Sequence, residues 1–493
     1  MSKDYTSPTR SFIPVNKYGM PLSQNRTSGS DIYRHNMPTD IVQTNHDIIT
    51  LTVPAFDRIK GGIDGFTDIE FVDKCFIRIY CRHLAIYNNP DERTTPKNRG
   101  EGSLTEPYVS LRDALVKASC YLRTTCLSVN VLIMPDSDPV VFQDYHSSTL
   151  NNDKLWIGDP YGGMFKAIGG IWHVPSATIC GMDYTAMVGP DYTMSEFYEK
   201  DLSCANGCIL YNCYIKNIHR LHCDMVIKSE IKARAYRNPQ SPIYMGWDGC
   251  NVICDLIYKS TLNLTLMNML TIDKAFGSTI TVEWLPGEQY GSNDAIYDYI
   301  YSRTVLYNCT INGCIVSGDI GAGIEDHMST QLREFNYIVG CNINNCYGLD
   351  YGSGLIKDSN VTCTARQLLS FYGYIMPTLS AGIIDNVTVD YNFVVIPRPG
   401  YGSPSGMGFS AVHIPHGGVA HNCNVTLNVK FKQYRNESYA GAVILCDISE
   451  HNPESTVAND QGKCVQNCRV VTYRFGDAPA PDVSGLSCNA IYA

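Results

Sequence analysis

An acidic, tyrosine-rich stretch of the chain holds the residues best suited to chemistry on a sugar polymer. Residues 269–302 supply Asp298, and the glycine-containing segment 317–336 supplies Glu325 and Asp326. Hydrolysis of a glycosidic bond uses two carboxyl groups flanking the bond, roughly 5–5.5 Å apart for retention of configuration and about 6.5–9.5 Å for inversion. These three acids are therefore the candidate catalytic residues. The spacing leaves open the alternative that they are solvated loop acids.

The same stretch is crowded with aromatic residues. Alternation along a strand places every second side chain on one face, which groups the three tyrosines from position 297 to position 301. Aromatic rings stack on sugars, and a tyrosine adds a hydroxyl group, although a subunit interface uses the same residue types. The candidate glycan-binding residues are Trp284, Tyr290, Tyr297, Tyr299 and Tyr301.

The sequence contains no motif typical of a metal site or a cofactor site. The nearest cysteine pairs are four residues apart, at 204/208, 250/254 and 464/468, and no second pair of matching spacing accompanies any of them. A nucleotide-binding P-loop, a nucleophile elbow and a zinc-protease motif are also missing from the sequence. We therefore predict neither a metal site nor a cofactor.

A recurring phrase indicates the elements that must position these side chains. Each copy runs from an apolar pair through a small polar residue, usually Asn, to Cys and then to Ile or Val two residues later. The clearest copies are LYNCYI at 210–215, LYNCTI at 306–311, AHNCNV at 420–425 and VQNCRV at 465–470. Copies that recur with variable intervening loops suggest a solenoid, and a local period of two makes each unit strand, bend, strand. The phrase predicts a parallel β-helix.

The residue types of the phrase fit such a bend. Asn tolerates the left-handed backbone conformation of a sharp turn, and its amide can hydrogen-bond to the neighbouring coil. Cys is a small apolar residue that can point inward after the bend, with the following Ile or Val on the same side. We therefore expect the 21 cysteines to be mostly buried free thiols and not disulfides.

Composition narrows the possible partners and locations. The formal net charge of −10 argues against DNA or RNA as a main partner and against binding to an anionic membrane surface. The start of the chain has no apolar segment of the signal-peptide type, and no run reaches the ~18–20 apolar residues of a membrane span. The sequence predicts a chain made in the cytoplasm of its host cell, without membrane insertion.

The chain divides into four predicted regions. Residues 1–45 form an extended arm, 46–99 a small β-rich attachment or capping region with a linker, 100–475 the β-helix with loop inserts, and 476–493 a tail. The spacing of Ser110 and Asp113 resembles a capping box. It precedes an apolar helical stripe that we expect to cover the open end of the solenoid, made of Leu111, Leu115, Ala118 and Leu122.

One longer phrase resembles a known superfamily. The segment GEGSLTEPYVSLRDAL at 100–115, followed by a helix and the strand VNVLIMP at 129–135, looks like the entry into right-handed β-helices of the pectin-lyase-like superfamily. That superfamily includes phage tailspikes and polysaccharide lyases. The clustered Asp ligands and basic residue of the lyases are not recognisable here. With the Asn-Cys phrases, the resemblance covers roughly residues 100–475 and specifies a fold more than a function.

The resemblance implies a role that the site residues alone do not. A phage virion protein of tailspike or fibre type is expected, with residues 1–90 attached to other virion proteins and β-helix loops touching a host-surface glycan. Proteins of this kind are usually homotrimers. Two alternatives stay open: a glycan depolymerase acting as hydrolase or lyase, and a purely structural capsid-decoration or baseplate component.

Overall fold

The computed structural model describes most of the chain from residue 41 onward. The residues outside the described part are 1–40, 44–47, 58–61, 73–74, 88–99, 125–127, 142–153, 169–176, 186–201, 204–207, 235, 238–246, 249, 266, 284–295, 318–326, 334, 348–353, 370–378, 397–406, 415–417, 432–438, 447–464, 467, 477–487 and 493. The chain forms two compact units, Met1–Lys232 (unit 1) and Ala233–Ala493 (unit 2).

Unit 1 consists mainly of two parallel sheets whose strands alternate along the chain. The first sheet contains β4 (Cys75–Cys81), β5 (Ser128–Ile133), β7 (Leu155–Gly158), β9 (Thr178–Cys180), β12 (Ile209–Tyr211) and β14 (Arg220–Ile227), with β11 (Leu202–Ser203) also beside β14. The second contains β6 (Val140–Val141), β8 (Phe165–Ile168), β10 (Met182–Thr185) and β13 (Tyr214–Ile218). Between two neighbouring parallel strands of one sheet, the chain passes through a strand of the other sheet. This is the connectivity of a β-helix-like solenoid.

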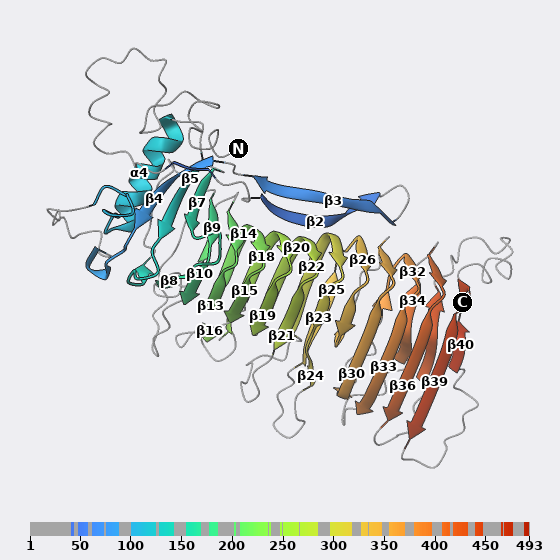
Figure 1. Ribbon diagram of the computed structural model, residues 1–493. Coiled ribbons are helices and arrows are strands. Elements are labelled where there is room, and N and C mark those ends of the chain that lie inside the picture. The colour runs from blue at the N-terminus through green and yellow to red at the C-terminus, as the bar shows by residue number, and fades with distance from the viewer. Residues whose placement is uncertain are drawn as a thin grey trace. The chain divides into compact units, whose positions relative to one another are not determined.

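Unit 2 repeats this arrangement. Its first sheet contains β18 (Cys250–Tyr258), β20 (Met267–Phe276), β22 (Ile296–Tyr307), β26 (Tyr337–Val339), β29 (Leu355–Lys357), β32 (Ile383–Asp385), β35 (Val419–His421) and β38 (Val465–Gln466). Its second contains β19 (Thr261–Thr265), β21 (Thr279–Glu283), β23 (Thr310–Asn312), β27 (Asn342–Asn344), β30 (Asn360–Leu369), β33 (Thr388–Ile396), β36 (Asn424–Phe431) and β39 (Arg469–Gly476). Figure 1 shows the last strands of this second sheet side by side.

Shorter strands complete the two units. In unit 2, β25 (His327–Arg333) and β28 (Cys346–Tyr347) extend the first sheet, β24 (Ile315–Ser317) pairs antiparallel with β25, and β16 (Tyr236–Arg237) pairs with β17 (Trp247–Asp248). A third parallel sheet contains β31 (Leu379–Ser380), β34 (Met407–Ile414), β37 (Tyr439–Cys446) and β40 (Cys488–Tyr492). In unit 1, β2 (Ile48–Asp57) and β3 (Gly62–Val72) form a hairpin, and β1 (Ile41–Gln43) pairs antiparallel with β4.

The Asn residues of the recurring phrase adopt the backbone conformation predicted for them. Asn212, Asn308 and Asn422 have φ of 52°, 50° and 55°, in the left-handed region. Adjacent coils place Gly340 and Asp358 at the same step, with φ of 66° and 49°. A side chain at Gly340 would also force the Asn308 side chain to shift, because a Cβ there would lie 2.2 Å from Oδ1 of Asn308. Bends of one conformation therefore stack from coil to coil.

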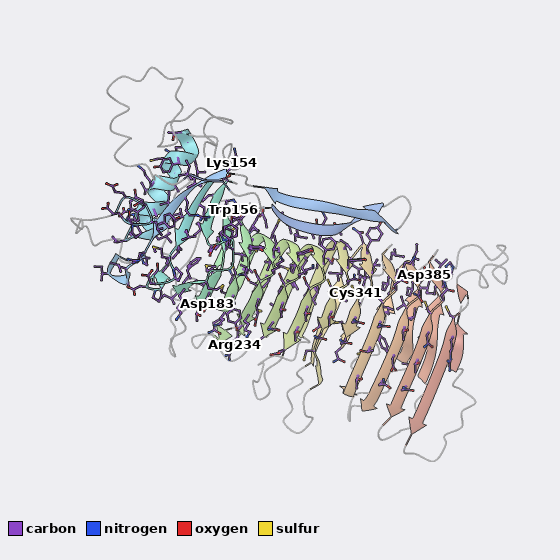
Figure 2. The ribbon with its side chains drawn as sticks, viewed as in Figure 1. Lys154, Trp156, Asp183, Arg234, Cys341 and Asp385 are labelled. Atoms are coloured by element: carbon purple, nitrogen blue, oxygen red, sulfur yellow. The ribbon has the colours of Figure 1, made fainter. Side chains whose placement is uncertain are left out.

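The residues that follow the bends point inward, and their thiol and hydroxyl groups stack from coil to coil as a ladder. The Cys213 N–H donates to Ser229 Oγ at 2.9 Å in unit 1. In unit 2 the Cys309 N–H donates to Cys341 Sγ at 3.4 Å, and the Cys341 N–H donates to Ser359 Oγ at 3.1 Å. The predicted inward position of Cys is confirmed (Cys341 is labelled in Figure 2), and the structure adds a second role, because Cys and Ser both accept the N–H of the previous coil.

The cysteines of the described part are free thiols. Among the cysteines whose side chains the structure describes, Cys120 is exposed, Cys314 and Cys468 are half-buried, and the remaining twelve are buried. Burial raises the pKa of the Cys363 thiol to about 12. The Cys363 thiol is therefore protonated at neutral pH, which agrees with the structural role predicted for it.

The predicted helix forms at α4 (Leu111–Thr124) and packs against β4 and β5 (Figure 1). The expected stripe is correct at three of its positions but wrong at Leu122, which is only half-buried; Tyr121, three residues after Ala118, is buried instead. The Leu111 N–H at the start of the helix donates to Nδ1 of His83, 3.3 Å away. His83 follows β4, so the helix is capped by a segment distant in sequence.

Part of the predicted β-rich region 46–99 forms a strand of the first sheet of unit 1. Residues 75–81 form β4, which pairs in parallel with β5 over six residues, from Phe76 to Cys81. The short η1 helix (Ala85–Tyr87) follows it. No helix in the described part of the chain is long and apolar enough to cross a membrane.

Candidate functional site

The described residues cover only part of the acidic and aromatic site predicted from sequence. Strand β22 contains Asp298 together with the tyrosines at 297, 299 and 301, and Asp298 pairs in register with Thr330 of β25. The side chains at these four positions of β22 lie outside the described part, as do the whole residues Trp284, Tyr290, Glu325 and Asp326. Whether Asp298 approaches Glu325 or Asp326 therefore stays a prediction.

A different group of polar side chains is fully described, on the outer face of the second sheet of unit 1. Strand β13 reads Tyr-Ile-Lys from Tyr214, and the next strand in that sheet, β15 (Glu230–Arg234), begins Glu-Ile-Lys. The isoleucines, Ile215 and Ile231, are fully buried. Alternation therefore directs the flanking side chains outward. We call this group the Tyr214 cluster: Asp183, Tyr214, Lys216, Glu230 and Lys232.

The members of the Tyr214 cluster contact one another in a continuous chain. Lys216 Nζ lies 3.5 Å from Asp183 Oδ1 and 4.0 Å from the centroid of the Tyr214 ring. Lys232 Nζ lies 5.2 Å from the same centroid and donates to the Tyr214 hydroxyl at 2.9 Å. Its third contact is Glu230 Oε1, at 2.9 Å. Two cations thus approach one ring, each paired with an acid; Figure 2 labels Asp183 at the β10 end of the cluster.

Sheet register explains why these five side chains meet. Asp183 pairs with Tyr214, and Thr185, two residues on, pairs with Lys216. The Glu230 N–H donates to the Cys213 carbonyl oxygen at 2.9 Å, which brings the start of β15 level with the start of β13. On the other side, the exposed Lys166 of β8 pairs with Asp183 and adds a third lysine.

The neighbours of Lys232 stabilise its positive charge. The hydrogen bonds of Lys232 to the Tyr214 hydroxyl and then to Glu230 raise the pKa of its ammonium group. The Lys232 and Glu230 side chains are 44% and 39% exposed, and ion pairs this open to water contribute little to folding stability. The cluster is therefore poorly explained as a stabilising device.

The Tyr214 cluster presents hydrogen-bond donors, hydrogen-bond acceptors and an aromatic ring together on an outer sheet face. Lysines donate hydrogen bonds, carboxylates accept them, and both lysines approach the aromatic ring of Tyr214. No group of three or more His, Cys, Asp or Glu side chains within the described ranges is arranged to hold a metal ion. The cysteines at 250 and 254, considered above as ligands, are buried on β18.

Sequence reasoning concentrated on the loops and missed the Tyr214 cluster. The available signal was the repeated pattern of a polar or aromatic residue, Ile and Lys at 214–216 and 230–232, sixteen residues apart and each directly after a bend. The sequence did not reveal the register between β13 and β15, because the residues between the two strands do not determine how the strands align.

The comparisons with known proteins return no match: no family model, no curated protein and no solved structure is similar to this chain.

Proposed function

We propose that this chain is a glycan-contacting virion protein of the tailspike or fibre type, built on a right-handed β-helix. The observation that carries the proposal is the Tyr214 cluster, an aromatic ring with two lysines and two acids held on the outer face of a rigid parallel sheet. Right-handedness is what parallel strands joined by crossovers adopt in nearly all cases.

The rigidity of the scaffold supports binding. Tyr214 and Lys216 flank Ile215 on strand β13, and both Ile215 and Ile218 of that strand are fully buried. A binding group on a packed strand loses little conformational entropy when a ligand arrives, and that improves affinity. Repeated, weak contacts of this kind suit a polymer, because several copies in one oligomer add by multivalency.

In this proposal the N-terminal region anchors the chain to the particle. Residues 1–90 attach to other virion proteins, α4 closes the first coils, and the chain assembles as a homotrimer. We expect neither a nucleic acid nor an anionic membrane surface as a partner, because the formal net charge is −10.

The first experiment separates binding from cleavage. The purified full-length chain is incubated with surface polysaccharides from a panel of bacterial hosts, and bound protein, polymer size and reducing ends are followed together. Binding without loss of polymer size supports the proposal. A fall in polymer size would instead establish a depolymerase, with Asp298→Asn and Glu325→Gln as the next variants. No binding to any polymer would leave a structural virion component.

A further inference from the structure

Two pairs of cysteines in unit 2 occupy matching positions on neighbouring coils. Cys309 and Cys341 each follow a bend, and the Cys309 N–H donates to Cys341 Sγ at 3.4 Å. Cys423 and Cys468 repeat this arrangement further along the solenoid, where the Cys423 N–H donates to Cys468 Sγ, also at 3.4 Å. All four residues are thiols in this structure.

Sheet register brings Cys423 and Cys468 within reach of a disulfide bond. They directly precede Asn424 and Arg469, the first register partners of β36 and β39, which lie side by side in Figure 1. The Arg469 N–H donates to the Cys423 carbonyl oxygen at 2.8 Å, so the parallel ladder continues through the cysteines. Neighbouring strands lie about 4.7–4.9 Å apart, and the Cα atoms of a disulfide usually lie about 4.4–6.8 Å apart. The backbone therefore has a spacing that this bond accepts.

The side chains of this pair are also in contact. The Cys423 thiol hydrogen-bonds to Cys468, and this contact, followed by burial, raises the pKa of Cys423. Cys423 Sγ lies 3.0 Å from the carbonyl oxygen of His421, and Cys468 Sγ lies 3.6 Å from that of Ala420. Both sulfur atoms are thus held beside the same short stretch of backbone.

Exposure distinguishes the two pairs. Cys309 and Cys341 are each 1% exposed, so their sulfur atoms are closed to a dissolved oxidant while the chain is folded. Cys423 is 3% exposed, but Cys468 is only half-buried. Thiol–disulfide exchange begins when an accessible thiolate attacks a disulfide, and Cys468 is the member of its pair that can make this attack.

We propose that Cys423 and Cys468 form a redox-dependent crosslinking site, which a small-molecule disulfide such as oxidised glutathione closes in the folded chain. Cys468 loses its proton to solvent and attacks one sulfur of the reagent, which forms a mixed disulfide and releases one glutathione. Cys423 then loses its proton, and its sulfur displaces the second glutathione from Cys468. Two protein thiols are oxidised to one disulfide, and one reagent disulfide is reduced to two thiols.

The bond joins the coils that contain β36 and β39, through two cysteines that are 45 residues apart in the chain. Closing a loop of this length restricts the unfolded chain, so the oxidised protein is more stable than the reduced one. The site makes the stability of this part of unit 2 depend on the surrounding redox conditions. The inference goes beyond the proposed function and requires neither a glycan nor a particle.

The test is oxidation of the full-length folded chain. The protein is incubated with oxidised glutathione at mildly alkaline pH without denaturant, remaining thiols are alkylated, and peptides are identified by mass spectrometry without reduction. We expect one peptide pair joined through Cys423 and Cys468. The exposed Cys120 should carry glutathione, which shows that the reagent was active, whereas Cys309 and Cys341 should stay reduced.

Three outcomes would overturn the proposal. In a sample whose Cys120 carries glutathione, Cys423 and Cys468 could both remain thiols, or Cys468 could be joined to a different cysteine. Equal crosslinking of Cys309 to Cys341 would show that exposure does not select the pair.

A second measurement compares thermal unfolding before and after oxidation in the wild type, Cys468→Ser and Cys341→Ser. Serine keeps a hydrogen-bond acceptor at either position, as Ser229 and Ser359 do elsewhere in the ladder. Oxidation should raise the unfolding midpoint by at least about 4 °C in the wild type and in Cys341→Ser, and should leave that of Cys468→Ser unchanged. No rise in the wild type, or an equal rise in Cys468→Ser, would refute the proposal and would leave the polysaccharide assay unaffected.

Discussion

In the ladder of thiols and hydroxyls, we predict that Cys341 stabilises the fold as a hydrogen-bond acceptor as well as an apolar side chain. Its buried Sγ accepts the N–H of Cys309 at 3.4 Å and lies 3.4 Å from the carbonyl oxygens of Leu306 and Val339. Replacing Cys341 by Val keeps a small apolar side chain but removes the acceptor. The Cys309 N–H is then buried without its partner, at a cost of about 1–3 kcal/mol.

Replacing Cys341 by Ser separates the two roles of the residue. A hydroxyl group is smaller than a thiol but accepts and donates in the same directions, as Ser359 already does one coil further on. We therefore expect Cys341→Ser to cost less than about 1 kcal/mol and Cys341→Val to cost at least twice as much.

The assay is thermal unfolding followed by far-ultraviolet circular dichroism at one fixed scan rate, since a chain of two units need not unfold in a single step. For a unit of this size each kcal/mol shifts the midpoint by about 2–4 °C. Cys341→Val should therefore lower the midpoint by at least about 2 °C, and Cys341→Ser by clearly less. Equal losses for Ser and Val, or a greater loss for Ser, would show that Cys341 acts only as an apolar filler.

Three further predictions follow from the described residues. Asn308→Ala should cost about 1–2 kcal/mol in thermal unfolding because Asn308 has φ of 50°, whereas Asn308→Gly should cost less, and equal losses would contradict the stacked bends. Burial, then the nearby carboxylates of Asp113 and Glu101, raises the pKa of Tyr108 to about 12. The unfolded phenol ionises near pH 10, so this stabilisation is complete below about pH 10 and is lost as the pH rises towards 12; Tyr108→Phe should flatten that slope in unfolding measured between pH 9 and 12. A thiol-specific reagent at pH 8 should label Cys120 rapidly and Cys363 only after unfolding, as read by peptide mass spectrometry, and rapid labelling of Cys363 in the folded chain would contradict its burial.

Much of the fold was predictable because the bends of the solenoid require particular residues. The phrase around Asn212, Asn308 and Asn422 predicted left-handed bends followed by inward cysteines, and both are present. The bend at Gly340 belongs to a further copy of the phrase, VGCNI at 339–343, in which Gly replaces Asn. The cap that His83 supplies to α4 could not be predicted, because it joins segments 28 residues apart through a hydrogen bond that leaves no periodic pattern.

The candidate site was less predictable than the fold. The loop acids and aromatics were selected by residue type, and the side chains of Asp298 and its partners lie outside the described part. The Tyr214 cluster depends instead on register: a shift of one residue between β13 and β15 would turn Lys232 inward and Ile231 outward. Register is fixed by buried contacts distributed over the whole coil. A short sequence pattern cannot predict these contacts.

The most direct test of the central claim is a titration of the full-length chain with oligosaccharide prepared from a polysaccharide that it binds. Isothermal titration calorimetry compares the wild type, Tyr214→Ala and Tyr211→Ala, the last being a matched control because Lys228 Nζ also lies over the Tyr211 ring, at 5.7 Å. Loss of an aromatic contact worth about 1.4 kcal/mol weakens binding tenfold. We expect tenfold weaker binding for Tyr214→Ala and unchanged affinity for Tyr211→Ala. Equal affinity of all three proteins would place the glycan contact elsewhere on the chain and contradict the account.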